Sequence, residues 1–267
     1  MTDGIRRLLR VVIGVPLFAG VAGSIIILFC HMEAGGRIPF VLTLCAFGAG
    51  IMAWYIIRQR KQNRQVEALL DILYKEINPE KFIQESEKVL KTAKNRAFRD
   101  TLRLNLAVGY EAIGAYDKAI AVMKEIGIGT ADKVTKAMFY CNMATFYAEK
   151  GALSEAQMAY TAGQPFFEKA EKALPVGYIR LSRALLHFAE EQYEEAVEAF
   201  AGARNRGFED RHTMAKLQLF EARTHVKLGN IKEARKIYET ILQKNTYPYL
   251  KQTAKEECKK LDKTIEK

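Results

Sequence analysis

The sequence has little cysteine, proline or histidine, and these shortages exclude several classes of protein. Its 267 residues include four cysteines, six prolines and four histidines. No CxxC pair or disulfide framework is visible, which is compatible with a reducing cytosol. The histidines form no HExxH motif and no paired metal-ligand spacing. No nucleophile with an adjacent base stands out either, so we expect no enzyme, no metal, no cofactor and no small-molecule substrate.

Charge is missing from two long stretches near the N-terminus. Residues 11–30 and 38–57 each contain no charged side chain over 20 positions. A helix of that length spans about 30 Å, the thickness of the hydrocarbon core of a bilayer. The seven-residue link 31–37 is too short for anything but an antiparallel hairpin. The alternative, a cleaved signal peptide over the first stretch, is disfavoured because no clear small-x-small cleavage site precedes the second.

Basic residues flank the two stretches and predict their orientation. Three arginines lie in residues 1–10 and four basic residues in the segment 58–64, whereas Arg37 alone lies in the link. The excess of lysine and arginine predicts that both termini are cytoplasmic and that the link 31–37 is external. Anionic lipid headgroups are the natural partner of segment 58–64. Beyond it we see no basic stripe, so nucleic acid is not an expected partner.

The remaining chain repeats itself. A first alanine is followed twelve residues later by a second in four segments, at Ala107 and Ala119, Ala144 and Ala156, Ala184 and Ala196, and Ala222 and Ala234. Three residues after each first alanine stands a ring, in Tyr110, Tyr147, His187 and His225. Seven residues after it stand Gly114, Gly151, Glu191 and Gly229. Four residues after each second alanine stands a bulky group, in Met123, Tyr160, Phe200 and Tyr238.

Each repeated position has a physical meaning. Glycine supplies the left-handed conformation that ends a helix, so each segment predicts two antiparallel helices joined by a tight turn. Only small side chains fit where the two helices cross, which explains the paired alanines. One helix pair cannot bury its apolar face alone, so neighbouring pairs must stack.

These segments resemble tetratricopeptide repeats, most closely in NLAVGYEAIGAYDKAIAVM over residues 105–123. The resemblance implies a solenoid of four to five helix pairs over residues 65–245, so that with the membrane hairpin before it the whole chain is expected to be all-α. It also implies a capping helix over residues 246–267. A degenerate unit over residues 67–93 is expected at the start, with Glu85 in the slot of the second alanine.

The family binds peptides in a groove lined by the first helices, so the resemblance implies such a groove here. Its expected residues are Leu104, Val108, Met138, Cys141, Thr145, Tyr178, Leu181, Leu185, Phe188, Lys216, Arg223 and Lys227. Glu111 and Glu149 fall on the same face. Leu104 and Val108 replace the Lys and Asn that clamp a terminal carboxylate in chaperone-binding members, so an acidic chaperone tail is not expected.

The expected function is therefore a membrane-anchored scaffold or adaptor that presents this groove to the cytosol and binds a protein or peptide. Its lipid contact would be through residues 11–57. The alternative is an assembly or quality-control factor for a membrane or envelope complex, which contacts its partner through the hairpin itself.

Overall fold

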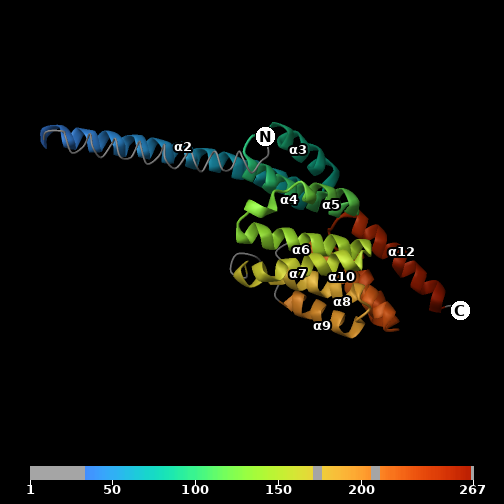
Figure 1. The fold of residues 1–267 in the computed structure, drawn as a ribbon. Helices are drawn as coiled ribbons and strands as arrows, with labels where there is room; N and C mark the ends of the chain where they lie inside the picture. The colour runs from blue at the N-terminus through green and yellow to red at the C-terminus, as the bar shows by residue number, and fades with distance from the viewer. Residues whose placement is uncertain (1–33, 171–175, 206–210, 266–267) are drawn as a thin grey trace. The chain divides into compact units, whose positions relative to one another are not determined.

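The structure is a computed structural model that describes residues 34–170, 176–205 and 211–265 (Figure 1). All regular secondary structure in these ranges is helical, which confirms the all-α prediction for the part described. The chain divides into two compact units, residues 1–63 and residues 64–267. We call the second unit the repeat domain. The first expected membrane helix, residues 11–30, lies outside the described residues.

The first described helix is longer than the sequence predicted. α2 (Ala34–Tyr74) has 41 residues. It begins inside the expected link 31–37 and continues without a break through residues 38–57 and 58–64. Several of its apolar side chains are exposed, among them Phe47, Ile51, Met52, Trp54, Tyr55, Ile56 and Ile57. Across the residues described, none of the helices has both the length and the apolar character needed to cross a bilayer.

The repeat domain consists of helix pairs in sequence order. The end of α2 pairs with α3 (Pro79–Thr92). The four predicted pairs follow as α4 (Arg96–Ala112) with α5 (Tyr116–Lys124), α6 (Lys133–Lys150) with α7 (Leu153–Ala170), α8 (Val176–Ala189) with α9 (Tyr193–Asn205), and α10 (Arg211–Lys227) with α11 (Ile231–Gln243). A short 3-10 helix, Ile128–Thr130, precedes α6, and α12 (Pro248–Ile265) ends the domain.

The paired alanines lie where the helices of each pair cross. All eight are at most 1% exposed, which confirms the repeat register in the four predicted pairs. The bulky groups that follow them behave alike in three repeats, because Met123, Phe200 and Tyr238 are also at most 1% exposed. Small side chains at the crossing bring the two backbones close, and the larger ones fill the space beside it.

The four turns between paired helices share one hydrogen-bonding pattern. In the first, the Gly114 N–H donates to the carbonyl of Glu111 and the Ala115 N–H to that of Tyr110, at 2.8 and 2.9 Å. The equivalent residue after the turn donates to Tyr147, His187 and His225 in the other three. This is the Schellman motif, which requires a left-handed residue. Gly114, Gly151, Gly229 and also Glu191 have φ between 60° and 80°.

Glu191 is therefore strained where its three counterparts are not. We expect Glu191→Gly to stabilise the protein by about 1 kcal/mol, because glycine adopts positive φ without a steric penalty. Removing the Glu191 side chain costs little packing energy, because it is exposed. Glu194→Gly, in the first turn of α9, is the matched control and should instead destabilise by about 1 kcal/mol. Thermal melts of both variants measure these changes in stability. If the two variants change stability in the same direction, the left-handed conformation of Glu191 is contradicted.

The first unit of the repeat domain has a different register from the one predicted. Ile77, with φ of 55°, ends the turn, and the Asn78 side chain caps α3 by accepting from the Lys81 N–H at 3.0 Å. This places Phe82 in the slot of the second alanine, three residues before the expected Glu85. Phe82 is 0% exposed, whereas Glu85 pairs with Lys88 near the surface.

A glycine in the next pair explains how a phenylalanine fits a slot built for alanine. A Cβ on Gly109 of α4 would lie 2.5 Å from Cδ1 of Phe82. The ring therefore occupies the space that a side chain would take elsewhere. The cost of a glycine inside a helix, about 1 kcal/mol relative to alanine, is offset by burial of a whole aromatic ring.

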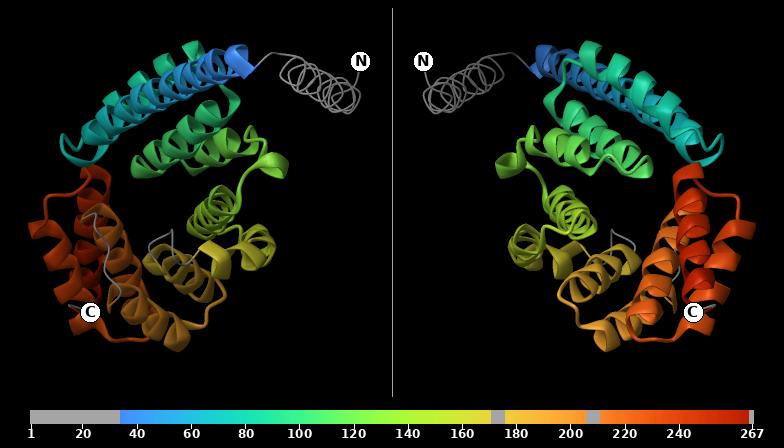
Figure 2. Two further views of the ribbon diagram at one scale, coloured as in Figure 1. Left: turned by 90° about the vertical axis from the view of Figure 1, so that its left-hand side faces the viewer. Right: turned by 90° about the vertical axis from the view of Figure 1, so that its right-hand side faces the viewer.

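The repeat helices curve so that the last ones meet the first (Figure 2). One buried cluster joins Leu73 of α2, Phe82 of α3 and Leu106 of α4 to residues of α10, α11 and α12, including Leu219, Tyr238 and Leu261. An open solenoid would leave the inner surface of the curve to solvent. Here the two ends of the repeat domain are packed together, and the inner surface is closed.

Candidate functional site

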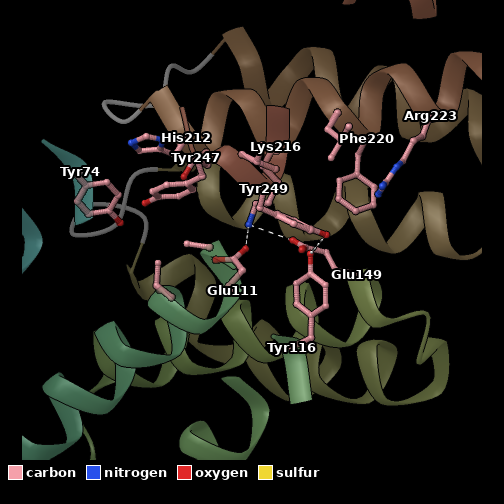
Figure 3. Close-up of a pocket in the computed structure, with 15 residues that line it drawn as sticks. Tyr74, Glu111, Tyr116, Glu149, His212, Lys216, Phe220, Arg223, Tyr247 and Tyr249 are labelled. Atoms are coloured by element: carbon pink, nitrogen blue, oxygen red, sulfur yellow. Dashed lines mark hydrogen bonds and ion pairs between the residues drawn. The ribbon is translucent and has the colours of Figure 1, made fainter. Parts of the chain in front are cut away.

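The inner surface centres on one lysine that reaches across the curve (Figure 3). Lys216 of α10 hydrogen-bonds through Nζ to Oε1 of Glu111 on α4. The same Nζ lies 3.2 Å from Oε1 of Glu149 on α6. The three side chains are 15%, 13% and 1% exposed. Residues 105 positions apart in the sequence are thus joined by a buried ion pair.

Two carboxylates face one ammonium, and this arrangement shifts the pKa values of Lys216 and Glu111. Burial disfavours the ammonium of Lys216, but attraction to Glu111 and Glu149 outweighs it and raises the pKa of Lys216 above its usual value. Burial, with repulsion from Glu149, raises the pKa of Glu111 to about 7, although Lys216 opposes the shift. Lys216 therefore stays protonated at neutral pH and cannot act as an amine nucleophile.

Two tyrosines lie beside the carboxylates and connect the cluster to the last helix. The hydroxyl of Tyr116, at the start of α5, lies 3.5 Å from that of Tyr249 on α12. Burial, with the neighbouring Glu149 charge, raises the pKa of Tyr116 well above its usual value, so the phenol stays neutral. The Tyr249 ring packs on the first turn, since a Cβ on Gly114 would lie 2.9 Å from it. Gly114 thus serves both the turn and this contact.

A second ion pair fixes α12 against α10. Nη2 of Arg223 donates to Oε1 of Glu257 at 2.6 Å, and Nε donates to the same carboxylate at 3.0 Å. The Tyr238 hydroxyl donates to Oε2 of Glu257 at 2.8 Å. Arg223 also lies over the ring of Phe220, 4.8 Å from its centre. The guanidinium is therefore held against Glu257 through Nε and Nη2.

An aromatic stack closes the other side of the inner surface. The His212 ring of α10 lies 3.8 Å from the ring of Tyr247 with 9° between their planes, and 6.0 Å from the ring of Tyr74 at the end of α2. Nδ1 of His212 is 2.9 Å from Oγ1 of Thr246. The stack joins residues from the first and last parts of the repeat domain, as the ion pairs do.

The space left among these side chains is small. The cavity lined by Tyr74, Glu111, Tyr116, Lys216 and Tyr249 has a volume of about 40 Å³. Since one water needs roughly 10–15 Å³ measured this way, the cavity has room for about three waters. An extended peptide with apolar anchors does not fit into it. The inner surface, in this closed form, is a packed interface between repeats.

The structure places the twelve expected groove residues in several environments rather than along one open groove. Five are buried in the cores between neighbouring helices, namely Leu104, Cys141, Thr145, Leu181 and Leu185. Five others are partly buried: Val108, Met138, Tyr178, Phe188 and Arg223. Lys216 is held by two carboxylates, and Lys227 alone of the twelve is exposed. Lys216 and Arg223, expected to face a ligand, instead pair with carboxylates of the chain itself.

Three residues that complete this site carry no signal in the sequence. Tyr116 and Tyr249 are 133 positions apart, and Glu257 lies on the helix expected only as a cap. None belongs to a repeated position that faces inward in the family. The sequence did place Glu111, Glu149 and Lys216 on the same predicted inner face, and these opposite charges were the one hint of an ion pair there.

Metal binding and thiol reactivity can each be assessed in the part of the chain that the structure describes. Among them, no group of three or more His, Cys, Asp or Glu side chains is arranged to hold a metal ion. The Cys141 thiol donates to the carbonyl of Tyr178 at 3.3 Å. Burial raises the pKa of Cys141 to about 11, so this thiol is not a reactive nucleophile at neutral pH.

No protein-family model matches the chain. No curated protein matches it either. Among solved structures, the chain is similar to the crystal structure of a tetratricopeptide repeat protein from Parabacteroides merdae ATCC 43184, with 15% identity and a TM-score of 0.35 over 76% of this chain and 93% of that one. On its own four turns and eight crossing alanines, the described part of this chain is an all-α array of tetratricopeptide-like repeats.

Proposed function

We propose that this protein is a membrane-anchored scaffold whose repeat domain binds a protein partner on its outer surface. The observation that carries the proposal is the closed inner surface. Stacked helix pairs whose interior is filled leave the outer helices, α5, α7, α9 and α11, as the surface on which a partner can dock. Arrays of this kind present extended surfaces to their partners.

The outer helix α7 is the best place to test for a partner. Residues 156–167 of α7 carry no charge, in a chain in which 27% of residues are charged. Met158 on this helix is 70% exposed. Apolar groups exposed on an otherwise charged surface are typical of protein contacts, and methionine adapts readily to a partner.

The experiment places a photo-reactive amino acid at position 158 of the intact chain in its native membrane. We expect one protein to cross-link there, and the same protein to cross-link after residues 1–57 are deleted. Position 236, exposed on α11, serves as the control. A partner that is lost on the deletion would favour the alternative function, in which the hairpin contacts the partner. An identical pattern from positions 158 and 236 would contradict docking on α7.

The proposed anchor has its own test. Residues 11–30 and 38–57 would form a membrane hairpin, with both termini and the repeat domain in the cytoplasm, because seven basic residues flank it against Arg37 in the link. Reporter fusions at residue 34 and at the C-terminus should therefore report opposite sides of the membrane. A cytoplasmic signal at residue 34 with an external C-terminus would end this topology.

A further inference from the structure

Two of the first helices in the repeat domain, α4 and α6, carry basic side chains in their first turns. The first turns of α4 and α6 contain no acidic residue and hold Arg96, Arg99, Lys133 and Lys136 instead. Positive charge near a helix N-terminus is unfavourable, because the helix dipole is positive there. The second helices α5, α7, α9 and α11 each have Asp or Glu in the first turn. Asn95 caps α4 and Asp132 caps α6, so both helix starts are stabilised by their caps, and helix stability does not explain the basic residues that follow.

These residues gather on one edge of the repeat domain. Paired helices run antiparallel, so α4 and α6 begin on the edge where α3 and α5 end (Figure 1). The ion pair between Arg103 of α4 and Glu125 after α5, at 2.9 Å, joins the two elements there. We define this basic edge by Lys94, Arg96, Arg99, Arg103, Lys124 and Lys133.

Most of the positive charge on the basic edge is not neutralised by the protein. Arg103 is engaged by Asp100 and Glu125, and Arg96 lies 3.9 Å from Asp100. Lys94, Arg99, Lys124 and Lys133 are all exposed, and within the described ranges no ion pair to a carboxylate forms at any of them. The edge therefore presents four positive charges that form no ion pair within the described part of the chain, beside the exposed carboxylate of Asp132.

The position of the edge identifies the partner. Residue 64, where the repeat domain begins, lies on this same edge, because α2 and α3 form an antiparallel pair whose turn is at the opposite end. The chain reaches residue 64 from the apolar stretch 38–57 through the basic segment 58–64. We propose that the basic edge rests on the anionic lipid headgroups of the membrane in which residues 11–57 are anchored. This inference rests on the anchor proposed above.

A nucleic acid is the competing partner for a basic surface, but the edge lacks what single strands require. Base stacking uses exposed aromatic side chains, and Phe98, the aromatic residue among the segments that form the basic edge, is partly buried against the core. A bilayer needs only a cluster of charges within a Debye length of its surface, about 8 Å at physiological ionic strength. The exposed lysines and arginines meet that requirement without further structure.

The experiment uses the full chain in vesicles of phosphatidylcholine, with or without phosphatidylserine. Cys30 and Cys45 are replaced by serine, and a dye is attached at Thr130→Cys on the basic edge or at Ser154→Cys near the opposite edge. Energy transfer to a headgroup-labelled lipid reports the approach of each edge to the membrane. Emission from Trp54, the one tryptophan in the sequence, separately reports insertion of the anchor.

We expect stronger transfer from position 130 than from position 154, but only when phosphatidylserine is present. Each basic residue near an anionic surface favours contact about fivefold, so Lys94→Glu with Arg99→Glu and Lys133→Glu should weaken contact at least a hundredfold. The control replaces Lys118, Lys227 and Lys232, three lysines near the opposite edge, with glutamate. It makes the same change in net charge and should leave transfer from position 130 unaltered.

The readouts separate failure of this inference from failure of the anchor. If Trp54 reports insertion while transfer from position 130 is the same in both kinds of vesicle, the basic edge does not contact the membrane and the anchor stands. If Trp54 fails to respond in either vesicle, the anchor itself is wrong. If a DNA duplex abolishes the phosphatidylserine-dependent transfer at equal charge concentration, the edge is a nucleic-acid site and the lipid proposal is overturned.

Discussion

We expect Lys216→Met to lower the free energy of unfolding by about 3–5 kcal/mol, the typical cost of removing one partner from a buried ion pair. Methionine keeps the length and packing of the side chain but removes its charge. Glu111 and Glu149 would then face each other without a cation, and both are largely buried. Urea unfolding of the full chain in mild detergent, followed by circular dichroism, measures the loss.

Two further variants separate the charge from the packing of Lys216. Lys227→Met changes an exposed lysine on the same helix and should alter stability by less than about 0.5 kcal/mol. Adding Glu111→Gln and Glu149→Gln to Lys216→Met removes the carboxyl groups left without Lys216 and should restore much of the lost stability. Equal unfolding curves for Lys216→Met and Lys227→Met would mean that the inner surface is open, and the groove expected from the sequence would return as a candidate site.

The repeated helix pairs could be predicted because their signals are local. The twelve-residue spacing of Ala107 and Ala119, with Gly114 between them, depends only on one turn and one crossing. The same reasoning holds in the third repeat, where Glu191 adopts the left-handed conformation despite its side chain. A tight turn between two antiparallel helices requires a left-handed residue, even where that residue is not glycine.

The register of the first unit could not be predicted, because it depends on a contact between different pairs. Phe82 occupies the alanine slot only because Gly109 of the neighbouring helix makes room for its ring. The sequence pattern within residues 67–93 favoured Glu85, since it lies at the family spacing before Ala119. Repeat spacing alone does not show whether a side chain fits against the neighbouring helix.

The surroundings of the expected groove could not be predicted for a similar reason. Its residues were assigned from the inner face of an open array, and nothing local indicates how strongly the array curves. Closure depends on Lys216 meeting Glu111 and Arg223 meeting Glu257, across 105 and 34 positions. Leu181→Asp, a natural test of a groove, would instead place a carboxylate in a core where Leu181 is 2% exposed. It would report on folding rather than on binding.

The second large effect concerns the pH dependence of the closed inner surface. The pKa of Glu111 is raised from its ordinary value of 4.5 to about 7 in the folded protein, mainly by burial. The folded state therefore binds this proton more tightly than the unfolded state does. Stability from this group is fully present below about pH 4.5 and is lost as the pH rises through 7. This direction is opposite to that of a carboxylate whose pKa is lowered by a salt bridge.

We therefore expect the stability of the native protein relative to Glu111→Gln to increase by about 2–3 kcal/mol between pH 8 and pH 5, since each pKa unit corresponds to 1.36 kcal/mol. Glutamine keeps an acceptor for Lys216 and cannot titrate, so other groups cancel in the comparison. Urea unfolding of both proteins at several pH values gives the difference directly. A difference that is constant across this range would show that Glu111 titrates normally, and that water reaches the centre of the inner surface more freely than its 40 Å³ cavity implies.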